Sequence, residues 1–294
     1  MINFRYHVVS IIGIFIALAV GVVLGAGPLQ RSINAGMNPS SSQAASDPVL
    51  SAQAEAEAAG LKALASSTLT GSLTGTSVAL VVLPGASDDD VSAIRSTLTD
   101  AGASVVGRVT LTDNWQSTSM SQYRTTLATT LASHLQSGAA KTASADGVVG
   151  YSIVQVLTST GAETDLLRQI LTDKSTPLMM IDEDPAGQAT TLVAVGARAQ
   201  TTTSTQASVA ASSDAWIGLG LAVGSTSGVV VGDASSREAM ISQIRTSGTA
   251  VTTVDSVGTT LASVDTALAL STASSGARAF GVGNGAQSVI PSSK

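Results

Sequence analysis

The stretch SVALVVLPGASDDDVSAIRSTLTDAG, residues 77–102, decides how the chain is expected to fold. It opens with SVALVVLP, a continuous apolar run of the kind expected for a β-strand buried on both faces of a sheet. After a turn, Val91, Ile94 and Leu98 recur at helical spacing, and Gly102 stands where a helix would end. The stretch therefore predicts a strand, a turn and a helix in succession.

The same alternation continues along the rest of the chain. Further strands are expected in ASVVGRVTL (103–111), TPLMMID (176–182), SGVVVGD (227–233) and AVTTVDSV (250–257). Helices are expected in YRTTLATTLASHL (123–135), LLRQIL (166–171), SREAMISQIRTSG (236–248) and TTLASVDTALALST (259–272). Strands that alternate with helices of this length pair mainly in parallel, through right-handed crossovers. We therefore expect residues 77–294 to form an α/β domain with a mainly parallel sheet.

Residues 28–76 differ in composition from this domain. GMNPSSSQAASDP, residues 36–48, is polar and rich in breakers, which is typical of a linker. Residues 49–69 consist of good helix formers, with possible contact positions at Leu50, Leu61, Leu64 and Leu69. Because these leucines keep no sustained heptad, a coiled coil here would be short or weak. We expect residues 28–76 to be a linker and a short helical stalk.

The N-terminal segment predicts a single transmembrane helix. Val8–Gly27 is apolar throughout, and its most polar member is Ser10. A helix of this length, at about 1.5 Å per residue, crosses a hydrocarbon core of about 30 Å. We expect an uncleaved signal anchor at 8–27, a cytoplasmic tail at 1–7 and the C-terminal domain outside the cell. Cleavage after the small residues Gly25–Gly27 remains the alternative.

Small residues line one face of this expected helix. Gly13, Ala17, Gly21 and Gly25 fall four residues apart, which is nearly one helical turn. Small residues in this register let two membrane helices approach closely. We therefore predict that the stripe contacts another helix, either of a second copy of this chain or of a different membrane protein. The alternative is that glycine and alanine are simply common in membrane helices.

Composition excludes several classes of function. The 294 residues include no cysteine, which rules out disulfides, thiol chemistry and cysteine metal sites. A formal net charge of -6 argues against a nucleic-acid partner, which would require a basic face. Aromatic residues make up only 3% of the chain, so its core is expected to consist of small aliphatic side chains.

The residues needed for catalysis or nucleotide binding are sparse. The histidines are His7, beside the expected anchor, and His134, near the end of a predicted helix, where an exposed position is the simpler interpretation. GSTSG at 224–228 has a central threonine and precedes a strand, so it is no nucleophile elbow. GVGNGA at 281–286 has no room for a following helix, and GLGLAVG at 218–224 is more typical of a closely packed helix. We expect neither an enzyme nor a bound cofactor.

Acidic clusters and methionines are the remaining candidates for metal sites. Asp88–Asp90 stand where a helix begins, where the helix dipole and capping favour carboxylates. Asp182–Asp184 follow an expected strand, at an edge where a hard cation could sit, although a solvated turn is the simpler interpretation. Met179 and Met180 are adjacent in a strand and so point to opposite faces. The residues predict no copper site.

The first residues carry a family resemblance. MINFRYHVVSIIGIFIALAVGVVLGAGPL, residues 1–29, closely resembles the start of the actinobacterial family named for mycobacterial copper transport protein B. The shared features are the FRYHVVS lead and a glycine-marked span that ends in GVVLG. Later blocks are also similar, namely VALVVLPGA, AGASVVGRVTLTDNW, TVDSVGT and GVGNGAQSVIP. The resemblance covers nearly the whole chain, although relatives tend to have a longer coiled coil in the stalk.

The resemblance implies two functions. The family name implies copper efflux through an outer-membrane channel, and corynebacterial relatives resemble single-pass envelope proteins that act in cell separation with a membrane partner and a peptidoglycan-hydrolase system. One anchor and no evident copper ligands favour an anchored domain that works by contacts. We therefore expect a scaffold or adaptor in cell separation or wall remodelling. Copper transport or homeostasis is the alternative, and copper is a possible partner by resemblance alone.

Overall fold

The computed structural model describes residues 48–199, 210–272 and 277–291 of the chain. The expected tail, anchor and glycine stripe lie outside these residues. In the part that is described, no helix has both the length and the apolar character needed to cross a bilayer. The chain divides into two compact units, residues 1–54 and 55–294, and the α/β fold belongs to the second.

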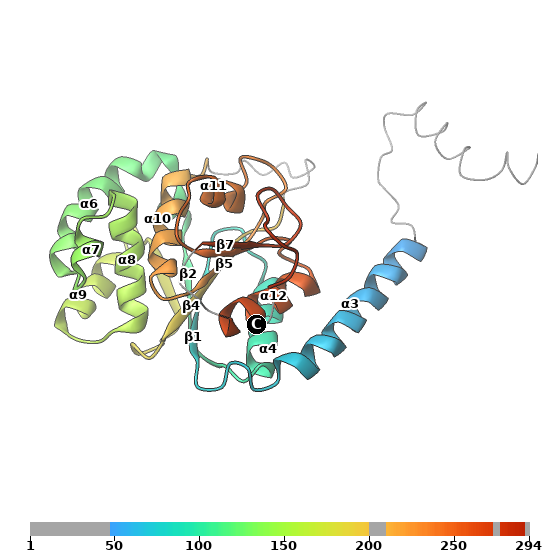
Figure 1. The fold of residues 1–294 in the computed structure, drawn as a ribbon. Coiled ribbons are helices and arrows are strands. Elements are labelled where there is room, and N and C mark those ends of the chain that lie inside the picture. The colour runs from blue at the N-terminus through green and yellow to red at the C-terminus, as the bar shows by residue number, and fades with distance from the viewer. Residues whose placement is uncertain (1–47, 200–209, 273–276, 292–294) are drawn as a thin grey trace, which may run out of the picture. The chain divides into compact units, whose positions relative to one another are not determined.

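The α/β fold is built on a sheet with the strand order β3-β2-β1-β4-β5-β6-β7 (Figure 1). The strands are β1 Ser77–Val82, β2 Ser104–Leu111, β3 Met179–Glu183, β4 Thr191–Val195, β5 Val229–Val231, β6 Thr252–Val254 and β7 Arg278–Phe280. All neighbouring pairs except β2–β3 are parallel. The predicted mainly parallel α/β domain is therefore confirmed.

The apolar run that predicted β1 is buried on both faces, as expected. Ala79 and Val81 pack into the hydrophobic core on one face of the sheet, and Val78, Leu80 and Val82 pack into the core on the other. Successive side chains of a strand point to opposite faces, so a strand covered on both sides must be apolar at every position. β1 therefore lies inside the sheet, between β2 and β4.

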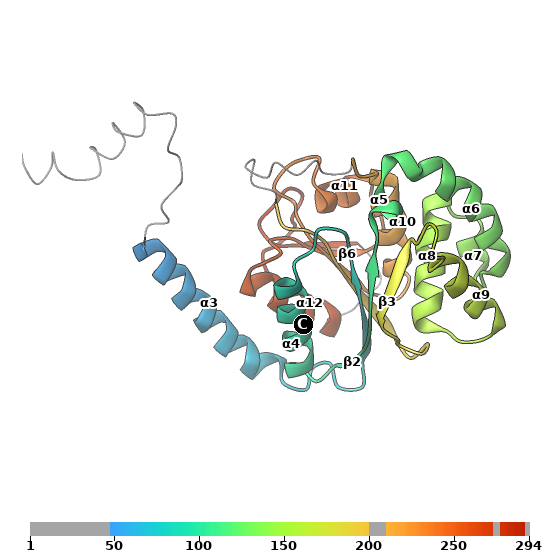
Figure 2. The same ribbon diagram turned by 180° about the vertical axis from the view of Figure 1, so that it is seen from behind.

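Helices cover both faces of the sheet (Figures 1 and 2). On one face lie α4 Asp88–Asp100, α12 Thr260–Ser271 and the C-terminal part of α3 Pro48–Leu69, whose Ala65 and Leu69 are buried in the same core. On the other face lie α6 Ser121–His134, α8 Ala145–Thr158, α9 Ala162–Leu171, α10 Ser213–Gly224 and α11 Met240–Thr246. The short helices α5 Asp113–Gln116, η1 Thr118–Met120 and α7 Gly138–Lys141 connect the elements on this second face.

The helix expected over residues 49–69 is present as α3, whereas its role as a stalk stays a prediction, and only some of its expected contact positions are buried. Leu69 is buried and Leu61 is partly buried against the core that includes α4 and α12. Leu50 and Leu64 are exposed, by 63% and 70% respectively. The contacts of α3 therefore lie toward its C-terminal end.

Glycines bring α8 and α10 into close contact. A Cβ atom at Gly218 would lie 2.5 Å from the carbonyl carbon of Asp146, and one at Gly150 would lie 2.6 Å from the carbonyl oxygen of Gly218. Neither distance is possible for a real side chain, so both positions require glycine. The prediction that GLGLAVG forms a closely packed helix is confirmed, because α10 contains it.

Candidate functional site

The order in which the chain adds strands to the sheet reverses between β1 and β4. The carboxyl ends of these two strands are therefore the first place to look for a binding site. The chain runs from β1 to β2 on one side, whereas β4 and the strands after it extend on the other. In open α/β sheets, ligands bind in the crevice at such a switch point. Here Asp90, in the first turn of α4, and Arg198, after β4, meet at this position.

Asp90 and Arg198 form a two-pronged ion pair. Arg198 donates from Nε to Oδ2 of Asp90 at 2.7 Å and from Nη2 to Oδ1 at 2.5 Å. The Asp90 side chain is 3% exposed, whereas the Arg198 side chain is 53% exposed. The hydrogen bonds from Arg198 to Asp90 raise the pKa of the guanidinium above its ordinary range. The carboxylate at the switch point is therefore already occupied by a cation from the chain itself.

Arg198 also passes over the loop that leads into α12. A Cβ atom at Gly258 would lie 2.4 Å from Nε of Arg198, and Gly258 has a φ of +90°, which favours glycine. One arginine thus contacts α4 through Asp90 and the α12 loop through Gly258. This links three separate parts of the chain at the switch point.

A groove of about 310 Å³ extends from this ion pair between α3, α4 and α12. This volume lies at the lower end of the range of about 300–1,000 Å³ that is typical of ligand pockets. The apolar residues that line the groove are Ala65, Leu69, Ala93, Ile94, Ala262 and Val264. Hydroxyl side chains and a few charged groups, among them Lys62, Asp89 and Asp100, complete its lining. The groove can accommodate a partly apolar partner without any change to the ion pair.

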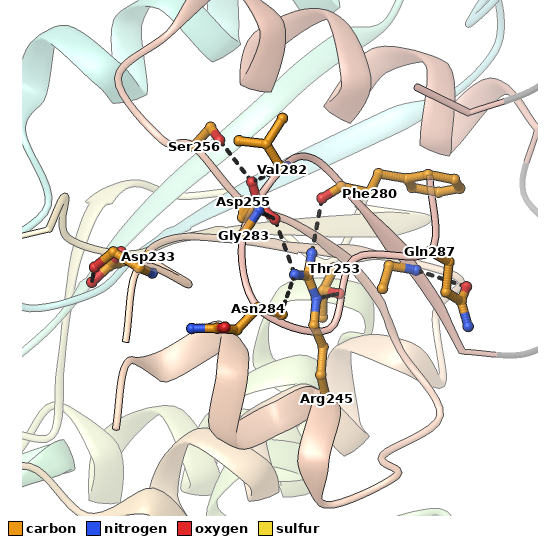
Figure 3. A network of polar contacts seen from close by, with 12 residues as sticks. Asp233, Arg245, Thr253, Asp255, Ser256, Phe280, Val282, Gly283, Asn284 and Gln287 are labelled. Atoms are coloured by element: carbon orange, nitrogen blue, oxygen red, sulfur yellow. Dashed lines mark hydrogen bonds and ion pairs between the residues drawn. The ribbon is translucent and has the colours of Figure 1, made fainter. Parts of the chain in front are cut away.

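A second polar centre lies at the carboxyl end of β6 (Figure 3). Asp255 is 1% exposed and accepts hydrogen bonds from the backbone N–H groups of Val282 and Gly283, both at 2.9 Å, and from the hydroxyl of Ser256 at 2.7 Å. Nη1 of Arg245, on α11, donates to the same carboxylate at 3.0 Å. The loop after β7 is thus fixed to β6 by a buried carboxylate.

Arg245 extends this network to neighbouring backbone. It donates to the carbonyl oxygens of Phe280 and Asn284, both at 2.8 Å, and to the hydroxyl of Thr253 at 3.0 Å. Burial on its own would raise the pKa of Asp255, but hydrogen bonds from Ser256 and the backbone at 282–283, together with Arg245, hold that pKa below its ordinary value. Burial lowers the pKa of Arg245. Both groups stay ionised near neutral pH, and their hydrogen bonds hold β6, β7 and α11 together.

The glycine-rich loop GVGNGA, residues 281–286, is part of the hydrogen-bond network around Asp255. Two of its N–H groups, those of Val282 and Gly283, point at Asp255, where a nucleotide-binding loop would point such groups at a phosphate. Among the described residues no helix follows the loop, as the sequence predicted. The loop therefore binds an anion of its own chain.

One comparison with known proteins identifies the family. The model of the family described as "Copper transport outer membrane protein, MctB" matches residues 1–291. The chain belongs to the MctB family. The resemblance seen in the N-terminal residues is thereby confirmed, and it connects the protein with copper transport and with the cell envelope. No curated protein matches the chain.

In this MctB-family chain most carboxylates of the two acidic clusters pair with arginines. The interpretation of Asp182–Asp184 as lying at the carboxyl edge of the sheet is wrong, because β3 is antiparallel to β2 and runs away from that edge. The carboxylates of this cluster pair with Arg108, Arg95 and Arg168. Asp88–Asp90 lie in the first turn of α4, as predicted, and the N-cap is Ser87. Asp88 pairs with Arg108 and Asp90 with Arg198, so these two carboxylates hold structural ion pairs.

His134, Met179 and Met180 take no part in either polar centre, and His7 lies outside the described residues. His134 is partly buried, with Nδ1 at 2.5 Å from Oε2 of Glu163, so it is less exposed than the sequence suggested. Met179 is buried and Met180 is half-exposed, which confirms that they point to opposite faces. Within residues 48–199, 210–272 and 277–291, no three or more histidine, aspartate and glutamate side chains are grouped so that they could hold a metal ion.

The sequence analysis did not find the residues that form the two polar centres in this member of the MctB family. Arg198 lies 108 residues from Asp90 in the sequence, so this pairing depends on the fold. Arg245 and Asp255 are only ten residues apart, but one lies on α11 and the other follows β6, so their pairing also depends on how these elements pack. Asp265 is different, because it is the only charged residue in the expected helix 259–272. Its burial could have been inferred from that pattern, since a lone acid among alanines and leucines has no cation within helical reach.

Proposed function

We propose that this protein contributes to copper transport or copper homeostasis as a non-enzymatic envelope protein whose α/β domain works by contacting a partner. The observation that carries the proposal is the match of the MctB family model to residues 1–291. The geometry supports a role through contacts, because the carboxylates at the switch point and at the end of β6 are bound by Arg198 and Arg245. Copper is the cargo in this proposal and is handled together with the partner.

The groove between α3, α4 and α12 is the proposed contact surface. It combines an apolar lining with hydroxyl groups, which is a composition typical of recognition sites. It also lies beside the Asp90–Arg198 pair, which fixes the start of α4 and the loop before α12. A partner bound there would contact a preformed surface, so little ordering would be needed on binding.

Filling the groove tests the proposal. Ala93 is exposed on α4 and lines the groove, so Ala93→Trp would occupy it without disturbing the buried core. Thr129→Trp, at an exposed position on α6 on the other face of the sheet, is the matched control. The tagged full-length variants would be cross-linked in cells, partners identified by mass spectrometry, and cellular copper measured.

We expect Ala93→Trp to lose the partner and to change cellular copper, and Thr129→Trp to retain both. Unchanged partner recovery and unchanged copper with Ala93→Trp would exclude the groove as the contact surface. Loss of the protein's effect on copper without loss of the partner would contradict a function through contacts.

A scaffold or adaptor in cell separation or wall remodelling is the second proposal. It shares the contact mechanism and rests on the resemblance to corynebacterial relatives. The same cross-linking experiment separates the two, since recovery of division or wall-hydrolase proteins with unchanged copper would favour the adaptor. In either case we propose that the chain is held by a signal anchor at 8–27, with the N-terminus inside.

A further inference from the structure

The helix α12, which forms one wall of the groove, carries a buried carboxyl group that has no hydrogen-bond partner. Asp265, near the middle of α12, is 0% exposed, and neither of its carboxyl oxygens has a hydrogen-bond partner. Buried polar groups are normally paired, because an unpaired one costs the free energy of its lost hydration. An ionised carboxylate in this position would be far more costly than a protonated one.

The elements packed on α12 provide no cation for Asp265. α12 packs on α4, β5 and β6, and the core around it consists of residues such as Val229, Val231 and Val254. From the end of β6, Asp255 acts on Asp265 with a like charge. Arg245 is engaged by Asp255, and on the α4 side Arg198 is engaged by Asp90. The remaining charged groups nearby are the carboxylates that line the groove, Asp89 and Asp100, and Lys62 on α3.

These observations lead to one inference about α12. We propose that α12 is a proton-controlled wall of the groove, which packs firmly on the sheet while Asp265 is protonated and opens more readily once Asp265 is ionised. α12 and the loop before it contribute Gly258–Thr260 and Ala262–Val264 to the groove, so the state of Asp265 sets how well the groove is formed. This inference rests on the structure of the groove and goes beyond the proposed function, because it holds whichever partner binds there.

The direction of the pH effect follows from the pKa of Asp265. Burial, with a smaller contribution from the like charge of Asp255, raises it from the ordinary value of 3.8 to about 7. When α12 opens, the carboxyl group meets water and regains its ordinary pKa. The closed state therefore binds the proton more tightly, and its advantage is greatest in acid. Between about pH 4 and pH 7 the opening equilibrium should rise about tenfold per pH unit, and above pH 7 it should level off.

Amide hydrogen exchange of the full-length protein in detergent micelles tests this directly. The opening equilibrium of peptides from α12 and from α8 would be measured between pH 5 and pH 8, after correction for the intrinsic pH dependence of exchange. In the wild type we expect α12 to open about fifty times more readily at pH 7 than at pH 5, because Asp265 is already half ionised at pH 7 in the closed state. α8, on the other face of the sheet, should change much less.

Two variants complete the experiment. Asp265→Asn keeps the shape of the side chain but cannot ionise, so the opening of α12 should no longer depend on pH. Asp100→Asn removes an exposed carboxylate that lines the same groove and should leave the wild-type slope unchanged. A flat wild-type profile for α12, or an unchanged slope in Asp265→Asn, would overturn the proposal. Should Asp265→Asn not fold, Asp265→Ser takes its place, and a flat wild-type profile still decides against the proposal by itself.

Discussion

Asp255 and Arg245 show how much of this structure depends on two side chains. Asp255 is 1% exposed and Arg245 is 7% exposed, and together they bond the strand β6, the loop after β7 and the helix α11. Replacing such a pair by apolar groups is often harmless, but removing one partner leaves an uncompensated buried charge. The two residues should therefore be much more sensitive to single substitutions than to a joint replacement.

Arg245→Met should destabilise the protein by about 3–5 kcal/mol, because it leaves Asp255 buried and unpaired. Arg95→Met is the matched control, since Arg95 pairs with Glu183 at the surface, and exposed pairs contribute about 0–1 kcal/mol. Urea unfolding of the full-length variants in detergent would give both values. An equal decrease in the free energy of unfolding for the two variants would show that the Asp255 network does not stabilise the fold more than a surface ion pair does.

The stability of Arg245→Met should also depend on pH in a defined direction. The folded pKa of Asp255 lies below its ordinary value, so its contribution to stability is present above that value and is lost as the pH falls through the folded pKa. The stability difference between wild type and Arg245→Met should therefore shrink in acid. A difference that grew in acid would contradict the assigned direction of the pKa shift.

At the scale of elements, the contact between α8 and α10 depends on glycine. The Cβ atom of an alanine at Gly218 would overlap the backbone of Asp146, where no side chain can move aside. Sheet and helices in this protein have few large side chains to fill gaps, since aromatic residues make up 3% of the chain. On the second face of the sheet the backbones of α8 and α10 are therefore in direct contact, and one added methyl group is enough to disturb their packing.

We expect Gly218→Ala to destabilise the protein by about 1–3 kcal/mol or more, as overpacking does in other cores. Gly60→Ala, in α3, has nothing within 4 Å of the new Cβ atom and should stabilise the helix by about 0.5–1 kcal/mol. Thermal unfolding of the two variants would show shifts of opposite sign. A neutral Gly218→Ala would mean that α8 and α10 can separate without cost.

The elements that the sequence failed to predict share a physical cause. β4 is central in the sheet, yet TLVAV is only five residues long and no amphipathic helix directly adjoins it. α8 is buried at most of its positions, so its sequence lacks the one-sided pattern that marks a surface helix. The antiparallel direction of β3 is decided by what it pairs with, which no local pattern records. β1, α4 and β2 were predictable because their patterns are long and unmixed.

At the scale of the whole molecule, the family model matches residues 1–291 of the chain, so a single match covers both the N-terminal segment and the α/β domain. The fold class could be predicted from the sequence. The switch-point pair, the Asp255 network and the groove could not, because each forms only when elements far apart in sequence pack together. The glycine stripe remains a prediction, since Gly13, Ala17, Gly21 and Gly25 lie outside the described residues.

The stripe can be tested in the intact protein. If Gly13, Ala17, Gly21 and Gly25 form a helix contact, Gly21→Leu should abolish cross-linking of the full-length chain within the membrane while insertion continues. Leucine is as apolar as the lipid, so only close helix approach is affected. Val23→Leu, two residues after Gly21 and therefore on the opposite side of the expected helix, provides the control and should cross-link normally. Unchanged cross-linking in Gly21→Leu would exclude the stripe as the contact.

The two outer strands of the sheet show how its open edges are protected from pairing with other molecules. An open strand edge is a template on which another chain can add, and sheets that grow in this way lead to aggregates. At one edge, β3 carries Asp182 and Glu183, and charge on an edge strand opposes such growth. At the other edge, β7 is covered by the chain itself, since the Gln287 N–H donates to the Ala279 carbonyl and the Gly281 N–H to the Ser288 carbonyl. A shortened protein that ended at Asn284 would lose this cover and would become prone to form fibrils through β7.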